Sequence, residues 1–118
     1  MSLEQHDELR RRTKQFALRI IRLSRSLPEN REGDVFGRQL LRAGTSVAAN
    51  YRAAGRSRSK ADFVSKISVV VEETDETVFW LELLQESGFV SGERLEPLLD
   101  EANQLVAIFS ASRRTAKA

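Results

Sequence analysis

Cysteine is absent from the 118-residue sequence, which removes disulfide frameworks, thiolate zinc sites and cysteine nucleophiles together. Histidine occurs once, as His6, so a general base or an imidazole metal ligand has a single candidate. No apolar run approaches the roughly 20 residues that span a bilayer, and residues 1–8 lack the pattern of a signal peptide. We therefore expect a soluble, unprocessed protein of a reducing cytoplasm, with no membrane partner.

Proline is also scarce, with only Pro28 and Pro97, while charged residues make up 31% of the chain. This combination favours long, exposed helices, and the length suits one domain over residues 1–118. The formal charge of +2 hides a division between the halves. Residues 1–60 contain 14 Lys and Arg against 6 Asp and Glu, whereas residues 61–118 contain 5 against 11. The first half can therefore attract polyanions.

Apolar residues recur at alternating spacings of four and three in four segments, and this spacing places side chains on one face of a helix. The clearest series lies in the third segment and consists of Phe63, Ile67, Val70, Thr74, Thr77, Leu81 and Leu84. The predicted helices cover about residues 3–27, 35–54, 59–87 and 92–112. Short loops imply antiparallel neighbours, so we predict an all-α fold, an antiparallel up-down-up-down four-helix bundle.

Local signals set the expected ends of these helices. Asp34 is the expected N-cap of the second helix, because its carboxylate can accept from the free amides of the first turn. Gly55 stands where a left-handed C-cap is expected, and Ser57 or Ser59 can cap the third helix. Residues 113–118 have little to bury, so we expect the end of the last helix to fray.

The acidic run of the third predicted helix is a weak candidate for a metal site. Glu72 and Glu76 share a helix face, but a di-metal site in a bundle needs histidines that this region lacks. A solvated acidic face explains the run more simply. His6 lies in a terminal segment that we expect to be mobile, and the glycines are too scattered for a phosphate loop. We predict no enzymatic activity, no cofactor and no metal.

Two further features have competing interpretations. Phe79 and Trp80 lie beside the apolar series of the third helix, and we favour core or subunit contact over base stacking because large aromatics are usually buried. The basic face of the first two helices is either a solubilising surface or a polyanion-binding surface. The arginines gather in one half of the chain instead of mixing with acids, which supports the second interpretation.

The segment over residues 42–63 contains an unusual motif with little bulk on one side and many cations on the other. Its distinctive positions are Ser46, Asn50, Arg56, Ser59 and Phe63. This motif resembles the signature of a four-helix bundle family, the proteins encoded in intervening sequences of bacterial 23S ribosomal RNA genes, often called S23 ribosomal proteins. The resemblance runs without gaps over residues 42–91, and the helix lengths agree on either side.

The resemblance implies a homopentamer in which antiparallel bundles form a barrel. It also implies kinship with the accessory protein of diversity-generating retroelements, which binds a reverse transcriptase and RNA through a basic surface. The sequence departs from the commoner pattern, because residues 50–54 read Asn-Tyr-Arg-Ala-Ala where many members have Asn-Ile-Ala-Glu-Gly. Glu72 and Glu73 also stand where many members have small residues. No function specific to this variety of sequence follows from the resemblance.

The signature has a structural interpretation. The small residues of the second helix would let the third helix come close. A buried Asn50 amide or Ser46 hydroxyl would then need a partner, with Glu73 or Glu76 as the natural candidates. We hypothesise that Asn50 and one of these carboxylates form a buried pair that fixes the register of the helices. The structural motif therefore comprises Arg42, Ser46, Asn50, Phe63, Glu73 and Glu76.

We predict a non-enzymatic, oligomeric bundle whose basic surface binds RNA or another nucleic acid through its phosphates. The predicted contact residues are Arg11, Arg12, Arg19, Arg22, Arg52, Arg56, Arg58 and Lys60. The alternative is a protein-interaction scaffold that docks an acidic protein partner on the same surface.

Overall fold

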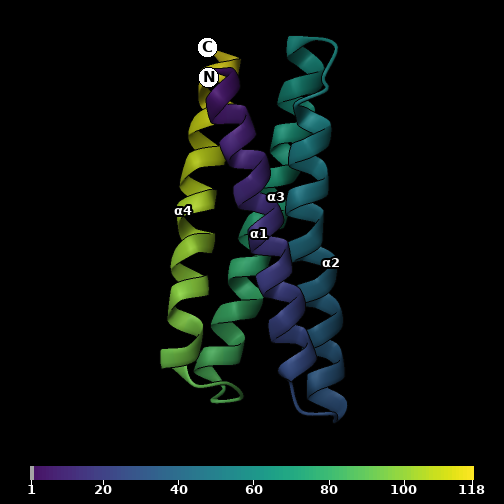
Figure 1. Ribbon diagram of the computed structural model, residues 1–118, viewed down its shortest axis with the longest axis vertical. Coiled ribbons are helices and arrows are strands. Elements are labelled where there is room, and N and C mark those ends of the chain that lie inside the picture. The colour runs from purple at the N-terminus through teal and green to yellow at the C-terminus, as the bar shows by residue number, and fades with distance from the viewer. Residues whose placement is uncertain (1) are drawn as a thin grey trace.

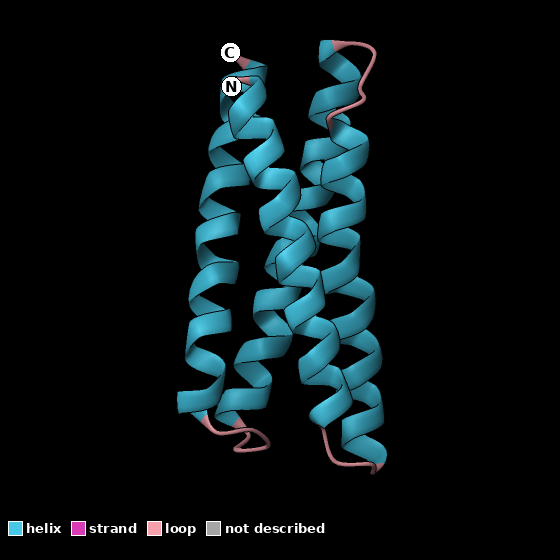
Figure 2. Ribbon diagram, in the orientation of Figure 1, coloured by secondary structure: helices cyan, strands magenta, loops and turns pink. Residues whose placement is uncertain are grey.

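The computed structural model describes residues 2–118, which form four antiparallel helices joined by short loops (Figures 1 and 2). The helices are α1 (Leu3–Ser26), α2 (Arg31–Ala54), α3 (Lys60–Glu86) and α4 (Gly92–Lys117). The bundle measures 45 × 21 × 21 Å, and both labelled chain ends lie beside each other at the end that holds the α2–α3 turn (Figure 1). The predicted all-α, antiparallel four-helix bundle is confirmed. No helix within residues 2–118 is long and apolar enough to cross a membrane.

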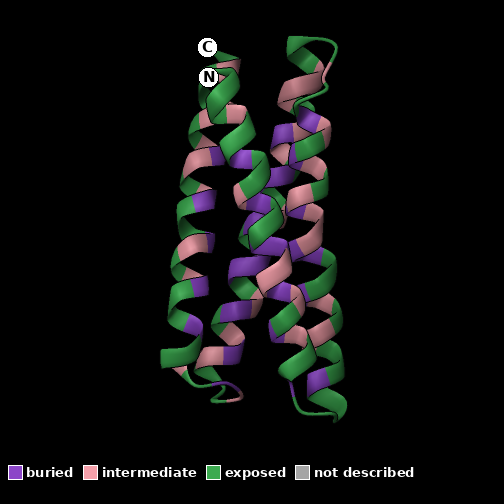
Figure 3. Ribbon diagram, viewed as in Figure 1, coloured by how far each residue is buried: buried purple, intermediate pink, exposed green. Residues whose placement is uncertain are grey.

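The buried side chains line the inside of the bundle, as Figure 3 shows by the inward placement of the buried segments. The largest fully buried side chains are Tyr51, Phe16, Phe109, Ile20, Leu40, Ile67, Leu81, Leu84, Leu95 and Leu105. They lie at the predicted apolar positions of all four helices, because a spacing of four and three keeps one stripe of each helix turned inward. Val90, within the α3–α4 turn, is buried and packs against that end of the core.

Three threonines are buried within the apolar core: Thr13, Thr74 and Thr77. Each hydroxyl donates to the main-chain carbonyl four residues earlier in its own helix, at 2.8, 2.6 and 2.8 Å respectively. A buried hydroxyl without a partner would cost free energy, so this local bond is what allows threonine to occupy a core position.

A close approach between α1 and α2 occurs at Gly44. A Cβ atom placed on Gly44 would lie 2.8 Å from Cγ1 and 2.9 Å from Cγ2 of Ile20, which is shorter than real contacts of that kind. We expected the small residues of α2 to admit α3. Gly44 admits α1, while α2 also packs against α3. Periodicity shows which residues face inward without showing which neighbour each of them meets.

The start of α2 differs from the prediction by four residues. The helix begins at Arg31, and its N-cap is Asn30, whose side-chain oxygen accepts from the amide of Gly33 at 2.9 Å. The turn is so tight that a Cβ on Gly33 would lie 1.9 Å from the carbonyl oxygen of Pro28. Asp34 lies within the first turn, where its carboxylate still favours the positive end of the helix.

The other helix ends are partly as predicted. Ser59 caps α3, with its hydroxyl accepting from the amide of Asp62 at 3.0 Å. Gly55 has a right-handed conformation, with φ of −65°, so the expected left-handed C-cap is wrong at this position. Gly88, after α3, does adopt positive φ, at 75°. The last helix continues to Lys117, and the expected fraying from residue 113 is therefore not observed.

Candidate functional site

A groove runs along the surface between α1 and α2, near the end that holds the α2–α3 turn. Two matched sets of side chains line it: Asp7, Arg10, Arg11 and Lys14 from α1, and Thr45, Ala48, Ala49 and Arg52 from α2. Both sets have the spacing i, i+3, i+4, i+7, which places them on one face of each helix. The space that they enclose is about 640 Å³. We call this feature the α1–α2 groove.

The α1–α2 groove is strongly basic, with four cationic side chains and one carboxylate among its lining residues. Arg10 forms an exposed ion pair with Asp7 one turn away on α1. Lys14 and Arg52 form no ion pair within residues 2–118. Because no carboxylate of α3 or α4 reaches the groove, its positive charge remains available to an external anion.

Arg12 has a different environment from its neighbour Arg11. Its guanidinium donates through Nε and Nη2 to the two carboxylate oxygens of Glu101, both at 2.7 Å, and through Nη2 to Gln104 at 2.8 Å. The hydrogen bond to Glu101 raises the pKa of Arg12, and only 26% of its side chain is exposed. Arg12 therefore holds α1 to α4, a structural role that our sequence interpretation did not foresee.

The predicted contact residues do not form one cluster. Arg11 and Arg52 line the α1–α2 groove, whereas Arg19 and Arg22 follow further along α1, away from it. The turn between α2 and α3, at the same end of the bundle as the groove, holds the remaining cations, Arg56, Arg58 and Lys60. Lys60 begins α3, and its Nζ donates to the main-chain oxygen of Ala118 at 3.0 Å.

Sequence reasoning left Arg10 and Lys14 out of the predicted site. Both lie on the α1 face that carries Asp7 and Arg11, and the repeat 7, 10, 11, 14 could have identified them. The matching repeat in α2 ends at Arg52. Comparing the two repeats would have shown that only one flank of α1 carries cations toward α2.

The signature residues of α2 and α3 meet through Arg42. Its Nη1 lies 3.3 Å from Oε2 of Glu73, and its Nη2 pairs with Glu76. The Asn50 amide instead donates to the carbonyl of Ser46 at 2.9 Å. The hypothesis of a buried pair between Asn50 and a carboxylate of α3 is therefore wrong. Arg42 of α2 pairs with those carboxylates instead.

The pKa values of Arg42 and Glu73 are both raised, for different reasons. The hydrogen bond that Arg42 donates to Glu76 raises the pKa of Arg42, although the arginine itself is well exposed. Burial raises the pKa of Glu73 above its usual range, and the charge of Arg42 opposes that shift only partly. The ionised form of Glu73 therefore lowers the stability of the folded state.

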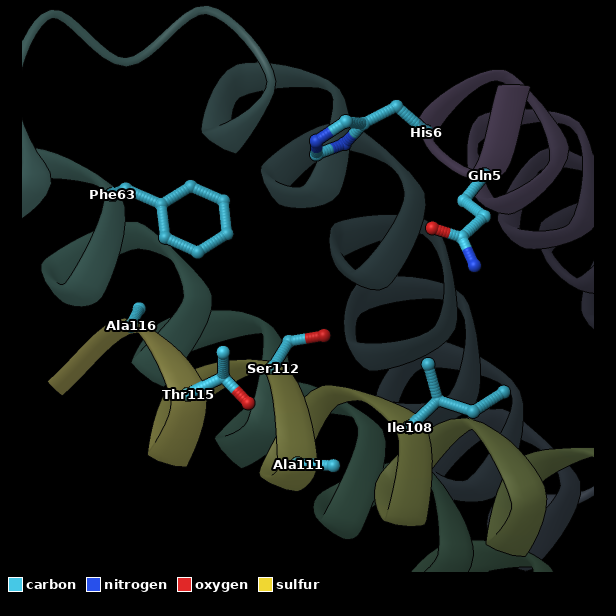
Figure 4. Close-up of a pocket in the computed structure, with 8 residues that line it drawn as sticks. All are labelled: Gln5, His6, Phe63, Ile108, Ala111, Ser112, Thr115 and Ala116. Carbon is cyan, nitrogen blue, oxygen red and sulfur yellow. The ribbon is translucent and has the colours of Figure 1, made fainter. Parts of the chain in front are cut away.

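A second cavity, of about 590 Å³, opens at the end of the bundle near the chain termini (Figure 4). Figure 4 shows His6 and Phe63 on opposite sides, with small side chains of α4 forming the floor. His6 is half-buried, and its Nδ1 lies 3.0 Å from the hydroxyl of Tyr51. His6 is therefore not the mobile solvent residue that we expected. Burial raises the pKa of Tyr51 to about 12.

The aromatic pair of α3 is divided between core and surface. Trp80 is half-buried and packs edge-on against Phe36 of α2, with ring centroids 6.2 Å apart. Phe79 packs against Trp80 but remains 51% exposed. Neither lies near the α1–α2 groove, and a role for Phe79 in subunit contact stays a prediction. Within residues 2–118, no group of three His, Asp or Glu side chains could hold a metal ion.

The fold and this surface define a class of protein: a helical bundle with a basic groove between its first two helices. Comparison with known proteins narrows the class to a family. The sequence profile described as "23S rRNA-intervening sequence protein" matches residues 5–111, and the chain therefore belongs to that family. The family resemblance inferred from the motif is thus confirmed.

A solved structure supports the same assignment. It is a protein of unknown function from the S23 ribosomal protein family of Bacteroides thetaiotaomicron, with a TM-score of 0.85 and 29% sequence identity. The similarity covers 92% of this chain and 97% of that chain. No curated protein matches this chain significantly. Neither comparison attributes an enzymatic activity to a relative.

Proposed function

We propose that this protein is a non-enzymatic, cytoplasmic nucleic-acid-binding bundle that contacts the phosphates of RNA through the α1–α2 groove. The observation that carries the proposal is the set of four cations, Arg10, Arg11, Lys14 and Arg52, around a groove that no carboxylate of α3 or α4 reaches. Release of counterions from a polyanion on such a surface is a strong, sequence-independent driving force. Arg56 and Arg58, at the same end of the bundle, extend the surface.

The composition of the groove supports contact with the backbone over recognition of bases. Its lining residues include no aromatic side chain on which a base could stack, and no Asn or Gln that could read a base edge. Arginine and lysine on a helix face are typical phosphate contacts. We therefore expect little sequence preference and a steep dependence on salt.

We also propose that the protein forms an oligomer. The family resemblance suggests a homopentamer. Phe79 is 51% exposed and Val69 is 37% exposed on the surface of α3, away from the groove. We propose these two side chains as candidate contacts with another subunit. Kinship with the retroelement accessory proteins stays a prediction.

Binding can be tested by fluorescence anisotropy with a structured RNA at 50 and 200 mM salt. We expect wild-type binding that weakens steeply between these concentrations, and an Arg52→Gln variant whose log–log salt slope is smaller by about one unit or less. Arg38→Gln is the matched control, because Arg38 is an exposed cation of α2 outside the groove. If wild-type protein binds neither RNA nor duplex DNA at 50 mM salt, the proposal is wrong.

The alternative is a scaffold that docks an acidic protein partner on the same surface. The charge of the α1–α2 groove is equally attractive to carboxylates, and this is the observation that keeps the alternative open. Two measurements on freshly purified protein separate the two functions. A high ratio of absorbance at 260 and 280 nm indicates co-purified nucleic acid, whereas a specific acidic protein in a pull-down supports the scaffold.

A further inference from the structure

The floor of the α1–α2 groove is built only from small side chains. Thr45, Ala48 and Ala49 of α2 face the cationic side chains of α1, and Arg52 follows them at the end of the same row. Packed helices lie about 8–10 Å apart, and the close contact of Gly44 with Ile20 draws these two together. The result is a narrow channel whose floor of methyl and hydroxyl groups is bordered by the cations of α1 along one side and by Arg52 at one end. We call these cationic side chains the rims.

We propose that the α1–α2 groove holds the backbone of one nucleic-acid strand, and thus that single-stranded RNA is preferred over a duplex. This inference rests on the proposed function and names its substrate class. A single phosphodiester chain can descend between the rims, with its phosphates against Arg11, Lys14 and Arg52 and its bases turned outward. The small floor is what leaves room for the chain.

The length of the groove fits a short stretch of strand. Residues 7–14 of α1 and residues 45–52 of α2 each rise about 10 Å along their helices. Phosphates recur every 3.4 Å or so along the axis of one stacked strand, so the groove spans about three of them. Four cations therefore face a similar number of phosphates. The exposed pairs of Arg10 and Arg11 with Asp7 and Glu8 are weak enough to be exchanged for phosphate contacts.

The same geometry disfavours two other occupants. A rigid duplex is wider than the spacing of the helices, so it would contact the rims and leave the floor untouched. A partner helix is about 10–12 Å across with its side chains and would also rest on the rims. The floor offers such a helix no deep pocket for a large apolar anchor, which is what tight protein interfaces require.

The decisive variant fills the floor without changing the charge. Ala49 is exposed and lies in the groove, so Ala49→Leu adds bulk there without entering the core. Ala107 of α4 is also exposed, and Ala107→Leu is the matched control. Ala49→Ser keeps the floor open and serves as the conservative variant. Circular dichroism and light scattering are used to check that all three variants retain the fold and assembly of the wild type.

Each protein is titrated by anisotropy at 50 mM salt into a 12-nucleotide RNA of mixed sequence and into its duplex. We expect tighter wild-type binding to the single strand, and about tenfold weaker binding of that strand by Ala49→Leu, equivalent to about 1.4 kcal/mol. Duplex binding should change less than about twofold, since rim contacts survive the substitution. Ala49→Ser and Ala107→Leu should bind both RNAs like the wild type.

The remaining outcomes overturn the inference in distinguishable ways. If the wild type binds RNA but Ala49→Leu binds the single strand equally well, the strand does not occupy the floor of the groove, and the proposed contact of RNA phosphates with the cationic side chains of the groove survives. Tighter wild-type binding to the duplex has the same meaning. If Ala49→Leu binds an acidic helical peptide more tightly than the wild type does, the groove is a protein-docking surface. A wild-type protein that binds neither RNA removes the proposed function itself.

Discussion

Helix α1 meets its two neighbours in different ways. It packs closely against α2, because Gly44 has no side chain to keep Ile20 away. It is joined to α4 by an ion pair, because Arg12 binds Glu101 through two hydrogen bonds. This difference decides which cations of α1 can bind a ligand. The close contact with α2 uses none of the groove cations, which form at most exposed pairs within α1, whereas the contact with α4 uses the charge of Arg12.

Arg11 and Arg12 show that neighbouring residues of the same type can have opposite roles. Successive residues of a helix point about 100° apart, so one turns toward the α1–α2 groove and the other toward α4. A count of arginines in the first half of the chain includes both. Only their partners reveal which of them is available to a ligand.

The largest expected effect comes from Gly44→Ala, which should lower the free energy of unfolding by about 1–3 kcal/mol through overpacking. The added methyl would meet the branched atoms of Ile20, which have no flexible end to move aside. Gly37→Ala is the control, since the nearest atom to its added methyl is 4.0 Å away, on Leu27. This control should stabilise the helix by about 0.5–1 kcal/mol. If urea denaturation gave the same change in unfolding free energy for Gly44→Ala and Gly37→Ala, the close packing of α1 against α2 at Gly44 would be contradicted.

The contact between α1 and α4 is tested by Arg12→Ala. Glu101, with 17% of its side chain exposed, would lose a paired charge, and we expect a loss of about 1–3 kcal/mol in unfolding free energy. RNA binding at low salt should remain close to that of the wild type. Arg11→Ala should do the reverse, weakening RNA binding while the melting temperature stays unchanged. If Arg12→Ala lowered RNA affinity without lowering stability, Arg12 would be a contact residue like Arg11, and the proposed difference between the two arginines would be wrong.

A smaller, pH-dependent effect is expected at the contact between α2 and α3. Burial raises the pKa of Glu73, so the folded protein binds that proton more tightly than the unfolded chain does. The charged form therefore costs stability that grows as the pH rises through the titration of Glu73. Glu73→Gln does not titrate, and its unfolding free energy relative to wild type should increase from about pH 4 to pH 7.

Urea denaturation at several pH values measures this difference. Glu72→Gln serves as the matched control, because it removes an exposed carboxylate from the neighbouring position of α3. A relative stability of Glu73→Gln that falls as the pH rises would mean that the ion pair with Arg42 outweighs the burial of the carboxylate.

The smallest effect is expected for Asn50→Ala. The amide of Asn50 bonds only within its own helix, to the carbonyl of Ser46, and alanine is the better helix former. The melting temperature should change little, in contrast to the clear decrease that the buried-pair hypothesis required. A large decrease would show that Asn50 joins α2 to another helix after all.

The helices and the fold were predictable from sequence because spacing and caps are local signals. The cap at Ser59 and the buried threonines of α3 follow from residues within one turn. The start of α2 was missed because Asn30 and Gly33 act through a tight turn against Pro28, which composition alone does not reveal.

The candidate site was only partly predictable, because it depends on how two helices face each other. The sequence identified Arg11 and Arg52 as basic residues but gave no reason to place them in one groove. The pairing of Arg12 with Glu101 was not foreseen, since the two residues lie 89 positions apart in the chain. Pairings of this kind follow from the rotation of each helix, which a periodic pattern leaves undetermined.

The buried threonines have one more consequence, for the alignment of the helices along the bundle. The hydroxyls of Thr13, Thr74 and Thr77 all bond to their own backbone, so none of them links one helix to the next. Sliding a helix by one turn would break none of these bonds. These hydroxyls therefore do not fix the alignment of the helices, which is left to the shape of the packed side chains, as at Gly44, and to contacts such as the pairs of Arg12 and Arg42.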